Sequence, residues 1–208
     1  MALNSLGDYT MKSIISDKTG VEGGYSNRAN DSGGETNHGI TIGVATQYAA
    51  WLKKLFNWDG TMKNLPLEAA FWIYETEYWK KINGDELLKR HPLIADKLFD
   101  IAINAGASTG VKFLQRILSA NNNQGKLYPD LVDDGGMGTL TLTGLDNFIK
   151  ARGKEGVIRL IAMLICEQGH FYLDLVQRRQ KDEEFYFGWC GRVTRDMGHY
   201  SKLLGIAV

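Results

Sequence analysis

The sequence predicts a mainly α fold with one small glycine-rich β-hairpin. Apolar residues recur at the spacing of an amphipathic helix through most of the chain. Strand-like alternation is scarce, and the one hairpin candidate runs from Glu22 to Thr41. A length of 208 residues with 44% hydrophobic residues suits one domain, or one domain with a small appended lobe.

Prolines, glycines and polar runs divide the chain into the expected helices. Pro66 suits the first turn of a helix, Asn83-Gly84-Asp85 breaks the helix that follows it, and Gly106 suits a helix end. The expected helices cover residues 5–18, 44–56, 65–79, 93–105, 111–120, a short stretch beginning near 139 or 141, 156–179 and 191–204.

Composition excludes several classes of function. The 24 basic and 24 acidic residues give a formal net charge of zero, so nothing in the bulk charge favours nucleic acid or an anionic membrane. The longest apolar run, residues 160–166, is too short to span a bilayer, so we expect no stable membrane insertion. Cys166 and Cys190 are expected to be buried and reduced. No Cys or His pair has metal-ligand spacing, so neither a metal nor a cofactor is expected.

The N-terminus lacks a basic start and a continuous apolar run, so we expect synthesis in the cytoplasm without a signal peptide. A substrate outside the membrane would then require export, with a helper such as a holin.

The hairpin candidate contains residues suited to acid/base hydrolysis. Six glycines between positions 20 and 41 indicate tight turns and close backbone approach. Glu22 follows an apolar valine at a helix end, a setting that raises a carboxyl pKa and suits a general acid. An inverting glycosidase needs a second group, roughly 6.5–9.5 Å from the acid, to orient water. Asp31 could supply it across the hairpin, and the Thr36 hydroxyl could hold the same water.

Each of these residues also has a purely structural interpretation. Asp31 lies in Asn30-Asp31-Ser32-Gly33, which is good Asx-turn chemistry. Glu22 could be a surface carboxylate beside a turn, and Thr36 could serve the hairpin alone.

Sugar-binding sites use aromatic faces and side-chain amides, which makes Tyr25, Trp79 and Trp189 candidates for substrate binding. All three could equally be core residues. Asp100 and Asn104 lie four apart on one helical face, where they could line a cleft or bridge helices. A buried Asp100 would need a partner, either Arg192 or the backbone amides of the loop that contains Glu22.

The glycine-rich stretch resembles the signature of the glycoside hydrolase family 108 muramidases, a group once called secretion activators. The matching residues are Glu22-Gly23-Gly24-Tyr25 and Asp31-x-Gly33-Gly34-x-Thr36-x-x-Gly39-Ile40-Thr41. Further along the chain, the resemblance includes Trp79, Gly84-Asp85, Phe99-Asp100-x-x-x-Asn104-x-Gly106 and Gly188-Trp189-x-x-Arg192.

The resemblance covers nearly the whole chain and implies a lysozyme-like helical fold. It also implies cleavage of peptidoglycan between N-acetylmuramic acid and N-acetylglucosamine, with Glu22 as the catalytic glutamate. The order Glu22, Asp31, Thr36 is similar to the phage-type lysozyme triad. One residue fewer separates Asp31 from Thr36 here, which leaves the role of Thr36 open.

The resemblance further implies two regions packed as one compact unit. Residues 1–105 would be the lysozyme-like catalytic region, and residues 106–208 a helical region that includes a predicted peptidoglycan-binding segment from Gly110 to Leu145. The residues that match this segment are Leu114-Gln115, Asp134-Gly135, Gly138 and Thr141. It could bind the wall or serve only as a structural lobe.

The leading hypothesis is therefore a muramidase of phage or prophage origin, such as an endolysin, that acts as a monomer on peptidoglycan glycan strands. One alternative is a lytic transglycosylase, which needs the acid but no water-holding Asp31 and yields a 1,6-anhydro sugar. Another is a wall-binding or secretion-promoting protein without turnover. An intact set of Glu22, Asp31 and Thr36 favours hydrolysis.

Overall fold

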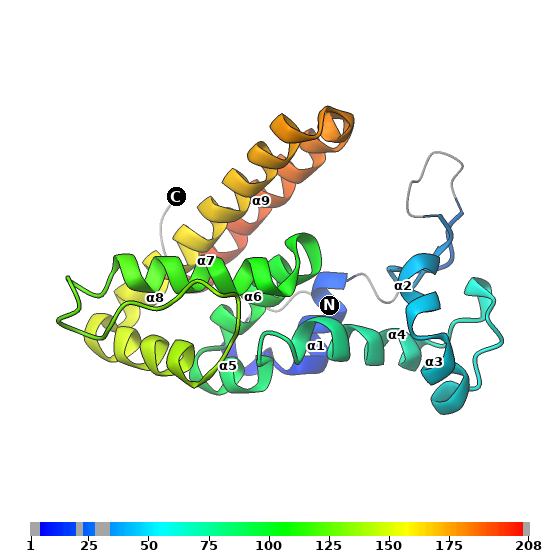
Figure 1. Ribbon diagram of the computed structural model, residues 1–208, viewed down its shortest axis with the longest axis horizontal. Helices are drawn as coiled ribbons and strands as arrows, with labels where there is room; N and C mark the ends of the chain where they lie inside the picture. The colour runs from blue at the N-terminus through cyan, green and yellow to red at the C-terminus, as the bar shows by residue number, and fades with distance from the viewer. Residues whose placement is uncertain (1–4, 20–22, 28–33, 206–208) are drawn as a thin grey trace.

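A computed structural model describes residues 5–19, 23–27 and 34–205. The fold is mainly α with one two-stranded antiparallel sheet, which confirms the predicted lysozyme-like class (Figure 1). The helices are α1 (Met11–Thr19), α2 (Ile42–Gln47), α3 (Ala49–Phe56), α4 (Leu67–Tyr74), α5 (Gly84–Arg90), α6 (Pro92–Ala105), α7 (Ala107–Ala120), α8 (Thr139–Arg178) and α9 (Glu183–Leu204). The strands are β1 (Thr36–Asn37) and β2 (Ile40–Thr41), and a π-helical turn, η3 (Glu75–Trp79), continues α4.

Helix α6 is the centre of the molecule. Every residue from Leu93 to Ala102 is buried, because α1, α5, α7, α8 and η3 surround this helix. Three of these buried residues, Asp96, Lys97 and Asp100, carry ionisable groups. Burial of charge is costly unless the groups pair, so the packing of α6 requires partners from neighbouring helices.

Helices α8 and α9 pack against each other, and the end of α8 with the start of α9 extends away from the rest of the molecule (Figure 1). Helix α8 bends at Gly153, whose backbone angles (φ 56°, ψ −150°) are not helical. This division agrees with the predicted short helix followed by a long helix from residue 156. None of the helices within the described residues combines the length and the apolar character needed to cross a bilayer.

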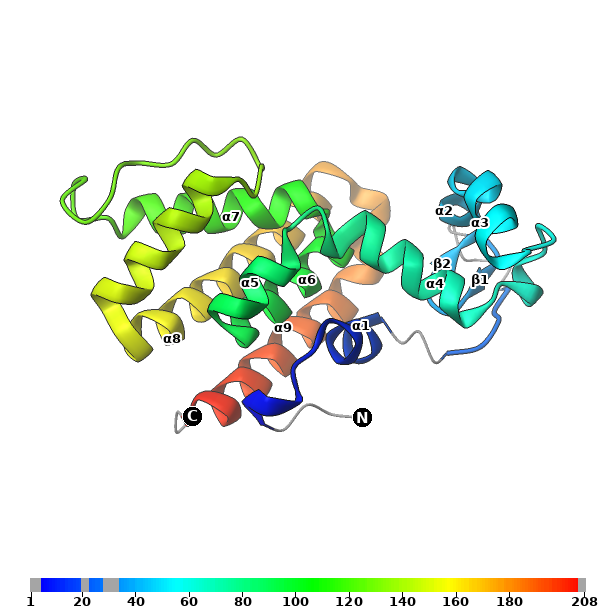
Figure 2. The same cartoon turned by 90° about the horizontal axis from the view of Figure 1, so that it is seen from below.

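The two strands and helices α2 and α3 form a small lobe at one end, and α4 connects it to the helical body (Figure 2). His38 and Gly39 join the strands with positive φ angles of 52° and 76°, as a two-residue hairpin turn requires. The Asn37 amide fixes the hairpin to the segment before α4, because it donates to the carbonyl oxygen of Met62 at 2.8 Å.

Several predicted boundaries were wrong. The helix expected at 44–56 is two helices, because the Tyr48 N–H bonds to Ala45, three residues back, and ends α2. Helix α5 was not predicted. Helix α9 begins at Glu183 instead of residue 191, so the aromatic run before Trp189 is helical. Cys166 is exposed, although it was expected to be buried.

Candidate functional site

A polar cavity of about 320 Å³ lies where the hairpin meets the helical body. The end of α1, the hairpin turn, α4 with η3, α6 and α9 all contribute to it. The described residues that line it are Lys18, Thr19, Gly39, Ile40, Thr41, Val44, Tyr74, Tyr78, Ile103, Asn104 and Arg192.

Gly39 allows the hairpin to approach the cavity wall closely. A Cβ atom at this position would lie 2.6 Å from the Thr19 carbonyl oxygen and even closer to the Tyr74 hydroxyl oxygen. The Tyr74 hydroxyl donates to the His38 carbonyl oxygen at 3.4 Å. The glycine of the Gly39-Ile40-Thr41 motif is therefore required both by its positive φ and by the lack of space.

Tyr74 and Tyr78 present aromatic groups to the cavity, with ring centroids 6.0 Å apart. Burial raises the pKa of both phenols, and the charge of the nearby Glu77 raises that of Tyr78 further. Both therefore stay protonated near neutral pH and can donate a hydrogen bond. The sequence analysis assigned them only to a central helix. Their spacing of four residues, which places both side chains on one helical face, is the sequence feature that could have identified them as a pair at a site.

Asn104 and Arg192 reach the cavity from α6 and α9, and Asp100 lies behind both of them. The Asn104 amide donates to the Asp100 carboxylate at 3.2 Å, and Arg192 Nη1 does so at 3.5 Å. Asp100 itself is only 2% exposed. It thus orients the two cavity residues without reaching the solvent.

A buried ionic network continues from Asp100 into the core. Lys97 Nζ lies 2.9 Å from Asp100 Oδ2 and 2.6 Å from Gln168 Oε1, and it also pairs with Asp196. Burial acts to raise the pKa of Asp100, but the Lys97 ammonium, the Lys18 charge and the Gln168 hydrogen bond together hold that pKa below its ordinary value. The expectation that a buried Asp100 is paired is confirmed, but Lys97 is the main partner and Arg192 a weaker one.

A second ion pair lies beside the first. Lys18 Nζ is 3.1 Å from Asp96 Oδ2, and the Tyr200 hydroxyl donates to the same oxygen at 2.5 Å. The other oxygen, Oδ1, is buried and has no hydrogen-bond partner among the described residues. Burial raises the pKa of Asp96 to about 6, although Lys18 opposes this effect.

Two of the three residues predicted for catalysis, Glu22 and Asp31, lie outside the described residues. Thr36 is half-buried, and its hydroxyl donates to the Gly34 carbonyl oxygen at 3.4 Å. It is not among the described residues that line the cavity. It pairs directly across the hairpin with Thr41, however, and Thr41 does line the cavity. Directly opposed residues share a face of the sheet, so both side chains lie on the same side.

The aromatic candidates for sugar binding differ in exposure. Trp79 is fully buried, and its ring N–H donates to Asp85 at 2.9 Å, so it has no surface to offer a sugar. Tyr25 is half-buried, with the Lys63 ammonium 5.2 Å from its ring centroid. Trp189 is half-buried on α9 and packs beside Tyr172, with ring centroids 5.2 Å apart.

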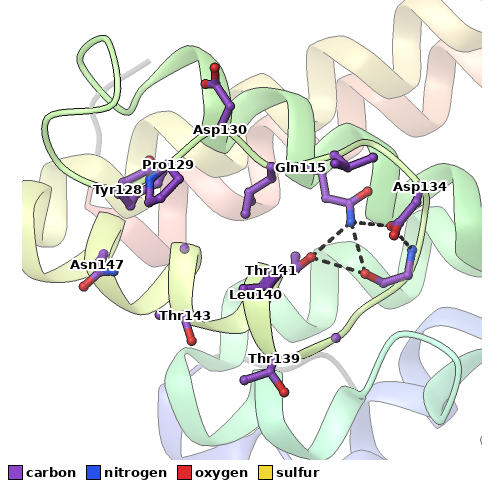
Figure 3. A pocket seen from close by; sticks show the side chains of 15 residues that line it. Gln115, Tyr128, Pro129, Asp130, Asp134, Thr139, Leu140, Thr141, Thr143 and Asn147 are labelled. Carbon is purple, nitrogen blue, oxygen red and sulfur yellow. Dashed lines mark hydrogen bonds between the residues drawn. The ribbon is translucent and has the colours of Figure 1, made fainter.

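A second cavity, of about 430 Å³, lies between the loop after α7 and the start of α8 (Figure 3). The Nε2 atom of the buried Gln115 amide organises its wall, because it shares its two N–H donors among Asp134, the Gly136 carbonyl oxygen and Thr141, at 2.9–3.1 Å. Its carbonyl oxygen accepts from the Gly135 N–H at 3.0 Å. Gln115, Asp134, Gly135 and Thr141 are among the residues that the sequence analysis matched to a peptidoglycan-binding segment, and their hydrogen bonds hold the loop closed.

Within residues 5–19, 23–27 and 34–205, no group of three or more His, Cys, Asp or Glu side chains could hold a metal ion.

Comparison with known proteins agrees with the order of the two regions. Residues 16–106 match the family model described as Glycosyl hydrolase 108, and residues 109–194 match the model described as Predicted Peptidoglycan domain. The solved structure of Brucella abortus SagA is similar in fold, with a TM-score of 0.59 and 25% sequence identity. That similarity covers 92% of this chain and 90% of SagA. The comparison with curated proteins yields no match.

Proposed function

The chain belongs to the glycosyl hydrolase 108 family, and from this premise we propose that it is an N-acetylmuramidase, cleaving peptidoglycan between N-acetylmuramic acid and N-acetylglucosamine. The family and the adjoining peptidoglycan domain make peptidoglycan the substrate and the cell wall the place of action. The observation that supports the specific reaction is the polar cavity beside the hairpin, because part of its wall belongs to the motifs that resemble the muramidases, namely Gly39, Ile40, Thr41, Asn104 and Arg192.

In the proposed mechanism, Glu22 is the general acid that protonates the leaving glycosidic oxygen as oxocarbenium character develops at the sugar. Glu22 follows Thr19 by three positions, and three residues of chain can span up to about 11 Å. Because Thr19 lines the cavity, the Glu22 carboxyl group is close enough in sequence to reach it.

Asp31 is the proposed base that orients the attacking water from the opposite face of the sugar, which gives inversion. Thr36 is proposed to hold that water through its hydroxyl. Its pairing with Thr41, a residue of the cavity wall, supports this role.

Substrate binding is proposed to involve Tyr25, Asn104 and Trp189 directly, and Asp100 through its hold on Asn104. Trp79 is left out of this set because it is buried. We further propose that the second cavity, with Leu140 80% exposed at its edge, contacts the wall. A monomeric state and a holin-type export helper stay predictions of the sequence.

The experiment is digestion of purified peptidoglycan, with mass spectrometry of the products, by wild type, Glu22→Gln and Asp31→Asn. The control is Glu68→Gln, which changes an exposed carboxylate on α4. The wild type and the control should release reducing N-acetylmuramic ends, and Glu22→Gln should retain wall binding without turnover. Asp31→Asn should lower the rate far more than it lowers the melting temperature.

Other outcomes select the alternatives. Anhydro-muramic ends would indicate a lytic transglycosylase, and wall retention by a folded wild type without any products would indicate a binding protein. Equal losses of rate and stability in Asp31→Asn would assign Asp31 to the turn alone.

A further inference from the structure

Arg192 is the contribution of the C-terminal region to the cavity. Among the described lining residues, all others belong to the segment that matches the hydrolase family, whereas Arg192 lies on α9 in the segment that matches the peptidoglycan domain. The family boundary therefore does not coincide with the boundary of the site. A wall of the hydrolase cavity is built by the region that follows the hydrolase segment.

The charge of the cavity wall is cationic where the structure describes it. The two charged side chains among the described lining residues are Lys18 and Arg192. Lys18 is already paired with Asp96 at 3.1 Å and with Asp17 at 3.4 Å, and its side chain is only 10% exposed. Arg192 is 30% exposed, so it is the more accessible of the two cations.

The ion pair between Arg192 and Asp100 is a weak one. The Asp100 carboxylate already accepts hydrogen bonds from Lys97 at 2.9 Å and from Gln168 at 3.0 Å, whereas Arg192 Nη1 is 3.5 Å away. A guanidinium has five N–H donors in a planar fork that matches a carboxylate in a bidentate manner. Within the described part of the chain, the contact with Asp100 thus orients the side chain and leaves most of its donors for another anion.

Peptidoglycan supplies such an anion only on its muramic-acid side. N-acetylglucosamine is neutral, whereas N-acetylmuramic acid carries a lactyl group that is either a free carboxylate or joined to a stem peptide with carboxylates of its own. We propose that Arg192 binds a carboxylate carried by the muramic-acid side of the substrate and thereby sets the specificity of the cavity. This proposal rests on peptidoglycan as the substrate of the proposed function.

The test compares native sacculi with sacculi whose carboxylates have been converted to neutral amides by a carbodiimide and ammonia. Arg192→Gln removes the charge and Arg192→Lys keeps it without the planar fork. Arg195→Gln is the matched control, because Arg195 is exposed on the same helix and does not line the cavity. Melting temperatures establish that all variants fold.

At sub-saturating native sacculi, we expect Arg192→Gln to release reducing ends about tenfold more slowly than wild type, as for the loss of one charge-assisted pair. Arg192→Lys should recover part of the rate, and Arg195→Gln should match wild type. On amidated sacculi, wild type and Arg192→Gln should be equal. The same fold-loss for Arg192→Gln on both substrates would overturn the proposal, because the residue would then act independently of substrate charge.

A third substrate distinguishes the two sources of the carboxylate. Treatment with an amidase removes the stem peptides and frees the lactyl carboxylate. Dependence on Arg192 that is lost after this treatment assigns the stem peptide, and dependence that persists assigns the lactyl group.

Sedimentation of each variant with native and amidated sacculi gives a readout that does not need turnover. If wild type releases no ends, the proposed function fails. Weaker retention of Arg192→Gln on native sacculi alone would still support the carboxylate contact, and equal retention on both would overturn it.

Discussion

Replacement of Gly39 by alanine should destabilise the protein more than the same replacement at Gly125. The two glycines have nearly equal positive φ angles, 76° and 77°, so the backbone strain of alanine, roughly 1–2 kcal/mol, is shared. The loss of unfolded-state freedom on replacing glycine is also shared. A Cβ at Gly125 would meet nothing within 4 Å, whereas at Gly39 it would lie 2.6 Å from the Thr19 carbonyl oxygen and closer still to Tyr74.

The difference between the two variants therefore isolates the steric clash. Overpacking of this kind costs typically about 1–3 kcal/mol, and backbone at Thr19 cannot move aside as a flexible side chain would. We expect the free energy of unfolding, measured by urea titration, to fall by about 2–5 kcal/mol for Gly39→Ala and by about 1–2 kcal/mol for Gly125→Ala. Turnover should fall only in Gly39→Ala. Equal losses of stability in the two variants would refute the close approach of the hairpin to α1 and α4.

The ionic network yields two further predictions. Lys97→Met should lower the free energy of unfolding by about 3–5 kcal/mol, because it leaves Asp100 and Asp196 buried without their cation. Lys89→Met, which removes an exposed ion pair, should change it little in the same urea titration, and similar losses would contradict the network. Asp96→Asn should alter the pH dependence of unfolding. The folded pKa of Asp96 is about 6 and its ordinary value is 3.8. Its contribution to stability is therefore fully present below pH 3.8 and is lost as the pH rises through 6. Unfolding titrations from pH 4 to 7 should show that this decline is absent in Asp96→Asn, and an unchanged profile would mean that Asp96 ionises normally.

Local signals predicted the helical elements well where turn residues separate them. Gly106 ends α6, and the chain turns at Asn83 between η3 and α5, because glycine and asparagine tolerate positive φ. The break at Tyr48 was missed, since the apolar pattern continues across it. Such a break depends on tertiary contacts, and the Tyr48 ring packs edge-on against Trp72 at 5.7 Å.

Exposure was the property that local patterns predicted least well. The helix carrying Trp79 is apolar on most sides, so its sequence does not say which side chains keep a free surface. Trp79 is covered by α6, where its ring centroid lies 5.7 Å from that of Phe99. On another side the ring packs directly against Gly84, where a Cβ atom would clash with it. Cys166 shows the reverse, because it lies among apolar neighbours on α8 yet is exposed.

The buried network could be predicted only in part. The sequence indicated that a buried Asp100 needs a partner, but it did not identify Lys97, which lies three residues away on the same helix. Gln168 and Asp196, the other members of the network, lie 68 and 99 residues from their partners. A charged residue in an apolar helix can be buried or exposed, and only the packing of α8 and α9 on α6 decides between them.

The sequence by itself determined the mainly α class, the glycine-rich stretch of chain that contains Glu22, Asp31 and Thr36, and the family that these residues indicate. These features are local, since they depend on periodicity, turn chemistry and spacing along the chain. Tertiary structure decided which side chains face the cavity. Tyr74 and Tyr78 meet Arg192 there although α4 with η3 and α9 lie far apart in sequence, because both segments contact the buried α6.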